Sequence, residues 1–104
     1  MSGTQTVVNV LYNAPSDPAA FEAYYTATHL PLVAKVQGIA QVVLIKCQPN
    51  ADGSPPAFYR IAQLFFASAA DMAASMGSPE GQAAVADIAN FATGGVTAIT
   101  GETT

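Results

Sequence analysis

Two segments in the middle of the chain limit its fold more than any other feature, because both of their faces are apolar. Residues 39–47 and 57–66 are rich in β-branched and aromatic residues, which is typical of strands. The alternating sets are Ile39, Val43 and Ile45 against Ala40, Val42 and Leu44, and then Phe58, Ala62, Leu64 and Phe66 against Tyr59, Ile61 and Phe65. A strand with one wet face alternates apolar and polar residues. A sheet built from these strands therefore needs cover on both faces.

The order of the expected elements is β-α-β-β-α-β, which is typical of the ferredoxin-like fold. Asp17-Pro18 is a strong helix start, since aspartate caps the first turn and proline fits within it. The loop signals of residues 49–56 predict a hairpin between the two apolar strands. We expect strands at residues 6–12, 39–47, 57–66 and 96–100, helices from Asp17, Ser68 and Ser78, and a tail at residues 101–104. The fold class is α+β: one domain over residues 1–104, with a four-stranded antiparallel sheet and helices on one side.

Helices on one side leave the other face of the sheet bare. Burying an exposed aliphatic or aromatic side chain is worth roughly 1.5–3 kcal/mol. Only 10% of the residues are charged, which is few for the surface of a small domain. The simplest cover is a second copy packed sheet to sheet, so we expect a homodimer.

Charge and cysteine content exclude several classes of partner. The net charge is −4, with three basic residues, which argues against nucleic acid and anionic membranes. No apolar run approaches the ~20 residues of a membrane-spanning helix, and the N-terminus does not read as a signal peptide. Cys47 is the single cysteine, so no intrachain disulfide can form. We therefore expect a cytoplasmic protein without a membrane partner.

The chain's only histidine, His29, lies four residues after Tyr25 and thus on the same helix face. Pro31 disfavours helical geometry at Leu30, so the regular helix should stop or kink there. His29 either binds the free carbonyls of a helix end or serves as a proton shuttle in a pocket. A carboxylate nearby would favour the second role, and Asp87 is a candidate for it. The alternative, which the residues themselves favour, is that Asp87 is solvated on a polar helix face.

The other candidates would form a pocket with apolar walls and a few polar points, which suits a small apolar molecule. The tyrosines are core residues or supply hydroxyls to such a pocket. Asn9 and Gln63 lie in apolar strands and face either a pocket or the solvent at an edge. The candidate binding residues are Tyr12, Tyr24, Asn9, Phe65 and Phe91. We expect no cofactor and no metal, because one histidine and one distant cysteine do not match zinc or iron spacing, and nothing else favours heme.

Several segments of the chain resemble the EthD domain. The most specific is Tyr24-Tyr25-x-x-x-His29-Leu30-Pro31-Leu32. The others are Leu11-Tyr12, Phe21, Gly38, Tyr59 to Phe66, Ser68, Asp71-Met72, Ser78-Pro79-Glu80 and Ala86 to Phe91. The resemblance implies a dimeric α+β barrel, in which two ferredoxin-like subunits pack their sheets together. It also implies that His29 matters most in the site, with Tyr25 beside it and Asp87 and Phe91 from the second helical region.

The family takes its name from a role in the degradation of ethyl tert-butyl ether. Related dimeric barrels include cofactor-free polyketide oxygenases and cyclases, muconolactone isomerases and heme-degrading enzymes. Three hypotheses follow for this chain. It is a cofactor-free enzyme on a small apolar or aromatic metabolite, with His29 and Tyr25 as catalytic residues and Asp87 beside them; or a dimer that carries an apolar intermediate; or a structural protein in which side chains fill the pocket.

Overall fold

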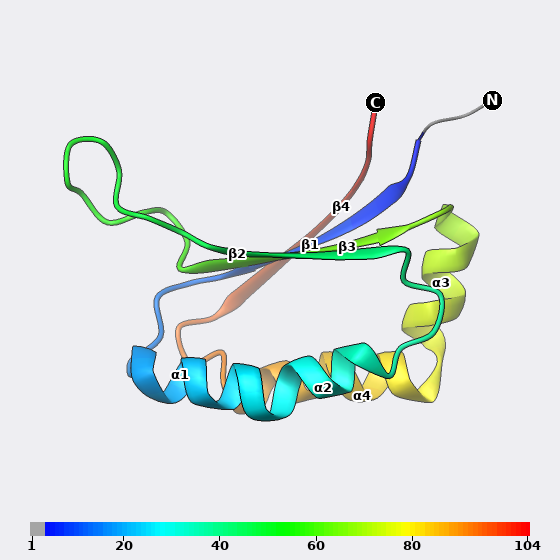
Figure 1. Cartoon of the computed structure of the whole chain (residues 1–104), viewed down its shortest axis with the longest axis horizontal. Coiled ribbons are helices and arrows are strands. Elements are labelled where there is room, and N and C mark those ends of the chain that lie inside the picture. The colour runs from blue at the N-terminus through cyan, green and yellow to red at the C-terminus, as the bar shows by residue number, and fades with distance from the viewer. Residues whose placement is uncertain (1–3) are drawn as a thin grey trace.

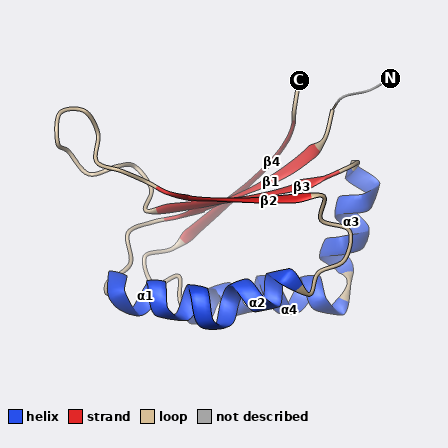
Figure 2. Ribbon diagram, viewed as in Figure 1, coloured by secondary structure: helices blue, strands red, loops and turns tan. Residues whose placement is uncertain are grey.

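A computed structural model describes residues 4–104 as one antiparallel sheet with helices on one side (Figures 1 and 2). The strands are β1 (Thr6–Tyr12), β2 (Gln41–Lys46), β3 (Arg60–Phe66) and β4 (Val96–Glu102). The helices are α1 (Pro18–Tyr24), the π-helical turn η1 (Tyr25–His29), α2 (Leu30–Ala34), α3 (Ala69–Gly77), α4 (Pro79–Asp87) and the 3-10 turn η2 (Ile88–Asn90). This arrangement confirms the predicted α+β, ferredoxin-like fold. Within this part of the chain no helix has the length and apolar character needed to span a bilayer.

The sheet has the strand order β2-β3-β1-β4, and all neighbouring strands are antiparallel. The predicted hairpin between β2 and β3 is confirmed. Residues 101 and 102, expected in a tail, extend β4, because Thr6 and Val7 of β1 pair with Glu102 and Gly101. The two central strands are thus β3 and β1, and each contributes one row of side chains to each face.

The helices cover the inner face of the sheet, where the core lies (Figure 1). Side chains of β1 and β3 alternate, so Val8, Val10 and Tyr12 point to the helices together with their partners Leu64, Ala62 and the aliphatic stem of Arg60. Phe21, Tyr25 and Phe91 come from the helical side and complete a largely aromatic core. Asp17 caps α1, and Ser68 and Ser78 cap α3 and α4, as predicted.

Pro31 predicted a stop or a kink near Leu30; the stop is wrong, since the helical run that begins at Pro18 continues past Leu30, although the regular α-helix is interrupted before it. The chain forms one π-helical turn and then continues as α2 to Ala34. In this wider turn the backbone N–H of Leu30 donates to the carbonyl of Tyr25. Pro31 lies in the first turn of α2, where its missing N–H is tolerated. The π turn is therefore the local adjustment that lets a helical run pass through proline, and it contains both Tyr25 and His29.

The outer face of the sheet has no helix over it (Figure 1). Register places these residues on that face: Val43 and Ile45 of β2, Ile61, Gln63 and Phe65 of β3, Val7, Asn9 and Leu11 of β1, and Ile99 of β4. Ile99, at 53% exposure, is the most open of the large apolar side chains in residues 4–104. At the centre, Gln63 donates to Asn9, and Asn9 donates to the carbonyl of Ile99. The outer face is thus apolar around a small amide cluster.

Candidate functional site

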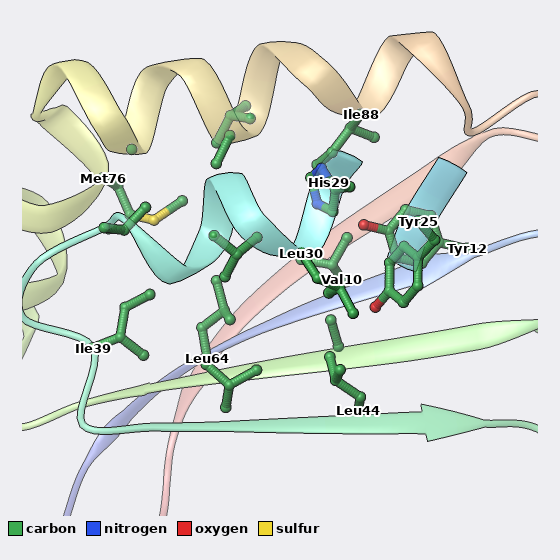
Figure 3. A pocket seen from close by; sticks show the side chains of 17 residues that line it. Val10, Tyr12, Tyr25, His29, Leu30, Ile39, Leu44, Leu64, Met76 and Ile88 are labelled. Carbon is green, nitrogen blue, oxygen red and sulfur yellow. The ribbon is translucent and has the colours of Figure 1, made fainter. Parts of the chain in front are cut away.

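An apolar cleft lies between the inner face of the sheet and the helical layer. Its walls come from β1, β2, β3 and the helices, its cavity volume is about 40 Å³, and it is partly open to solvent. Figure 3 shows Tyr12, Tyr25 and His29 together at one end, and Ile39 and Met76 at the other. The long axis of the cleft is therefore apolar, and its polar groups gather at one end.

Two hydroxyls at that end have no hydrogen-bond partner among residues 4–104. Tyr12 and Tyr25 are 1% and 2% exposed, and both line the cleft. Neither phenol makes a hydrogen bond to any residue of the described chain. Among the described residues no fully buried side-chain nitrogen or oxygen lacks a partner, so these two oxygens are not completely enclosed. These two groups are therefore available to a molecule in the cleft.

His29, which is 4% exposed, forms a buried pair with Asp87. Its Nδ1 atom lies 3.0 Å from Oδ2 of Asp87. The π turn η1 presents the imidazole, and the last residue of α4 presents the carboxylate. Asp87 also accepts bonds from the Tyr24 hydroxyl at 2.6 Å and the Asn90 amide at 3.0 Å, both at Oδ1. These bonds support the ionised carboxylate.

Burial shifts the pKa values of His29 and Asp87 in opposite directions. Burial lowers the pKa of His29 below its usual value, and the bond to Asp87 only partly offsets this effect. Burial raises the pKa of Asp87, but the bonds from Tyr24, Asn90 and His29 outweigh it, so the pKa lies below its usual value. At neutral pH the pair is thus a neutral imidazole and a carboxylate. The carboxylate can only accept, so Nδ1 carries the proton and Nε2 keeps a lone pair.

Aromatic rings hold the imidazole from two sides. The Phe91 ring lies 4.6 Å from the imidazole, and the Tyr25 ring stacks on it at 5.8 Å, measured between centroids. On the sheet side, the Arg60 guanidinium lies 5.0 Å from the centre of the Tyr25 ring and binds Glu22. Burial raises the pKa of Tyr25, and the Arg60 charge opposes this rise. Packing therefore fixes the positions of His29 and Tyr25 before any ligand binds.

The structure brings together six of the eight residues predicted from the sequence. His29, Tyr25 and Tyr12 line the cleft, Asp87 and Phe91 contact His29, and Tyr24 binds Asp87 from outside the cleft. The Tyr24 hydroxyl donates to Asp87, and its contact with a ligand stays a prediction.

The other two residues lie elsewhere. Asn9 and Phe65 are on the outer face of the sheet, where they line a separate hollow with Val7 and Gln63. Their strands alternate, so a residue one position from an inward side chain points outward. The sequence analysis missed Asn90, although its position three residues after Asp87 is the spacing that links neighbours on a helix. In residues 4–104 no cluster of three or more His, Cys, Asp or Glu side chains is arranged to bind a metal ion.

Comparisons with known proteins find one family by sequence and by fold. A family model for the EthD domain matches residues 13–95. An uncharacterised 11.0 kDa protein of the thcB–thcC intergenic region of Rhodococcus erythropolis is 48% identical over 90 residues, which is 86% of each chain. An EthD family protein of Bacillus halodurans has a crystal structure similar to this one, with a TM-score of 0.90 and 26% identity over 96% of this chain and 99% of that one. An EthD-like protein of Ralstonia eutropha has a crystal structure with a TM-score of 0.71 and 27% identity, over 99% of this chain and 92% of that one.

More distant structures share the fold alone. A dimeric ferredoxin-like protein of Thermobifida fusca has a TM-score of 0.70 at 17% identity, over 97% of this chain and 92% of that one. A hydroxynitrile lyase of Passiflora edulis has a TM-score of 0.74 at 13% identity, over 96% of this chain and 94% of that one. A mutant form of a cofactor-independent oxygenase of Streptomyces nogalater has a TM-score of 0.61 at 16% identity, over 99% of this chain and 93% of that one.

Proposed function

Because this chain belongs to the EthD domain family, we propose that it is a cofactor-free enzyme that moves a proton on a small, largely apolar molecule. The observation that carries the proposal is the buried His29–Asp87 pair at the polar end of an otherwise apolar cleft. The carboxylate holds Nδ1 in its protonated form, which leaves Nε2 as the base. A neutral imidazole with a lowered pKa is ready to accept a proton at neutral pH.

The two free phenols complete the proposed chemistry. A substrate C–H or O–H bond breaks as its proton moves to Nε2 of His29, and the bonding electrons remain on the substrate as an oxyanion. The hydroxyls of Tyr12 and Tyr25 donate to that oxygen, and Asp87 faces the imidazolium that forms. Donors already in place where charge develops are among the largest contributions to catalysis. Return of the proton from Nε2 of His29 to another substrate atom consumes the oxyanion and regenerates the base.

The second candidate is a carrier that holds an apolar molecule for a partner enzyme. The almost entirely apolar lining beyond the three polar groups favours it, since such a lining can bind without reacting. The two candidates differ in what they require from His29. An enzyme needs the basic nitrogen, whereas a carrier needs only the shape and apolar character of the cleft.

The protein is proposed to act as a homodimer. The uncovered outer face of the sheet supports this, because it exposes apolar side chains such as Ile45 and Ile99. A ferredoxin-like protein of Thermobifida fusca with a similar fold is described as dimeric, which supports the proposal. The unpaired Cys47 is in keeping with the reducing cytoplasm, which is the proposed location.

Proton exchange on a model ketone tests the proposal. 2-Tetralone carries acidic C–H bonds beside one carbonyl and has an apolar body, so its exchange in D2O can be followed by proton NMR, and its binding by shifts of protein signals. We expect the wild type to bind the ketone and to accelerate exchange. His29→Gln should bind but lose the acceleration, about 100-fold or more, since general base catalysis typically contributes 10²–10⁴-fold.

One further variant and the pattern of binding and exchange separate the candidates. Tyr25→Phe removes one hydroxyl and keeps the ring, so it should reduce exchange while the apolar contacts remain. Binding without exchange in the wild type, unchanged in His29→Gln, would favour the carrier. Equal exchange in the wild type and in His29→Gln would contradict the assignment of His29 as the base.

A further inference from the structure

The Asp87 carboxylate is shared by three donors from three different elements. Tyr24 of α1 and Asn90 of η2 donate to Oδ1, and His29 of η1 donates to Oδ2. Asp87 itself is 8% exposed, so water contributes little to its solvation. The carboxylate's negative charge is therefore divided among these side chains.

Hydrogen bonds to one carboxylate compete with one another. A strong donor at Oδ1 withdraws negative charge from Oδ2, which weakens the pull of the carboxylate on a proton at His29. The hydrogen bond donated to Oδ1 is stronger when the imidazole is neutral, because an imidazolium would already neutralise part of the negative charge of the Asp87 carboxylate. Donation by Tyr24 thus stabilises the neutral imidazole more than the imidazolium.

We propose that Tyr24 and Asn90 are positioning residues that keep His29 neutral by sharing the charge of Asp87. The inference rests on the proposed function, in which a neutral His29 is the base. It assigns Tyr24 a role that contact with a ligand does not explain, since its hydroxyl binds Asp87 at 2.6 Å and its side chain is not part of the cleft lining. Tyr24 and Asn90 instead line a separate hollow with Asp17 and Thr93.

The groups around the imidazole leave few other causes for a change in its protonation. Asp87 is the charged side chain that binds it, and the rings of Tyr25 and Phe91 contact it. Tyr24 bonds to Asp87, and Tyr12 of β1 lines the same cleft as His29. On β3, Arg60 lies against Tyr25 and is paired with Glu22 of α1. Replacement of Tyr24 by phenylalanine changes none of these charges and keeps the ring that stacks on Phe91.

NMR titration of the single imidazole tests the inference directly, because the chain has one histidine and hence one imidazole signal to assign. We expect Tyr24→Phe to raise the pKa of His29 by about 0.5 to 1 unit. Asn90→Ala should raise it by less, since its bond to Asp87 is longer. The matched control is Tyr59→Phe, which removes a phenol bond to a different carboxylate, that of Glu22, and should leave the pKa of His29 unchanged.

The outcomes separate this inference from the proposed function. A pKa of His29 that is the same in folded Tyr24→Phe as in the wild type, or that falls, overturns the inference even when His29→Gln abolishes proton exchange. A raised pKa supports it even when 2-tetralone does not react, in which case the enzyme proposal fails alone. A matching rise in Tyr59→Phe would show a general effect of lost phenols and would also overturn it. Circular dichroism checks that each variant is folded.

Discussion

At the scale of single residues, the site depends on a charged carboxylate kept out of water. Asp87 remains ionised because three side chains donate to it, and this ionised partner determines which nitrogen of His29 carries the proton. The sequence predicted Asp87 as one of two alternatives, since aspartate in an apolar helix can also face solvent. Only the three-dimensional packing of α4 against η1 distinguishes these alternatives. The free hydroxyls of Tyr12 and Tyr25 were likewise beyond sequence analysis, because a missing partner is a property of the folded chain.

Asp87→Asn should change the tautomer of His29. The amide can donate as well as accept, so it no longer holds the proton at Nδ1. We expect proton exchange on 2-tetralone to fall by at least 10-fold and nitrogen NMR to detect an Nε2–H population. Asp71→Asn, which alters an exposed carboxylate on α3, is the control. Unchanged exchange in Asp87→Asn would contradict the claim that Asp87 sets the tautomer of His29 needed for proton transfer.

His29 should also make the protein less stable in acid. Its pKa in the folded protein lies below the ordinary value of about 6.5, so below that pH the unfolded chain takes up a proton first. The contribution to stability is complete above pH 6.5 and is lost as the pH falls through the folded pKa. We expect the free energy of unfolding, measured with urea, to decrease from pH 7 to pH 5.

The same measurement on His29→Gln supplies the comparison. This variant has no imidazole to titrate, so its stability should vary less over that window. A wild type whose stability rises on acidification between pH 7 and pH 5 would mean that the folded state favours the imidazolium, against the description given above.

At the scale of elements, the π turn that precedes Pro31 places Tyr25 and His29 in the site. Pro31 was correctly identified as incompatible with an uninterrupted α-helix, but the expected end of the helix was wrong, because one wider turn absorbs the disruption. Helix starts were predictable, since Asp17, Ser68 and Ser78 cap through their own side chains. The wider turn was not predictable in the same way, because it depends on how α2 packs against α4. Both Tyr25 and His29 lie in this turn, so its geometry is part of the site.

Gly81 should be required for the close approach of α4 to α3. A Cβ atom at this position would lie 2.1 Å from the carbonyl oxygen of Ser75, which is backbone and cannot move aside freely. We expect Gly81→Ala to lower the free energy of unfolding by about 1–3 kcal/mol, as overpacking does.

Gly77→Ala is its matched control, since nothing lies within 4 Å of a Cβ at that position. It should be neutral or slightly stabilising, because alanine reduces the entropy of the unfolded chain. Equal destabilisation by both substitutions in urea unfolding would contradict the close packing of α3 and α4.

At the scale of the whole molecule, the two faces of the sheet have different roles. The inner face builds the cleft, whereas the outer face is left without a helix (Figure 2). The two-sided apolar pattern predicted this division, but it could not assign side chains such as Asn9 and Phe65 to a face. A shift of one residue along a strand moves a side chain to the other face, and only the observed register determines it. The amide cluster of Asn9 and Gln63 is therefore a feature of the outer face and not of the cleft.

Ile99→Lys should prevent pairing of two copies. Ile99 is 53% exposed on the outer face, so a lysine there costs the single subunit little but would place charge inside a sheet-to-sheet interface. Sedimentation should give a dimer for the wild type and a monomer for the variant. Val96→Lys is the control, because Val96 is 42% exposed on the same strand but shares a face with Tyr12. A wild type that sediments as a monomer at micromolar concentration would contradict the proposed dimer.

The most direct test of the account is the nitrogen NMR spectrum of His29 in the unmodified protein at pH 7. The central claim is that Asp87 holds this imidazole neutral, with the proton on Nδ1 and the lone pair of Nε2 toward the cleft. We expect one imidazole in the Nδ1–H form. A predominant Nε2–H form, or a fully protonated ring, would contradict it.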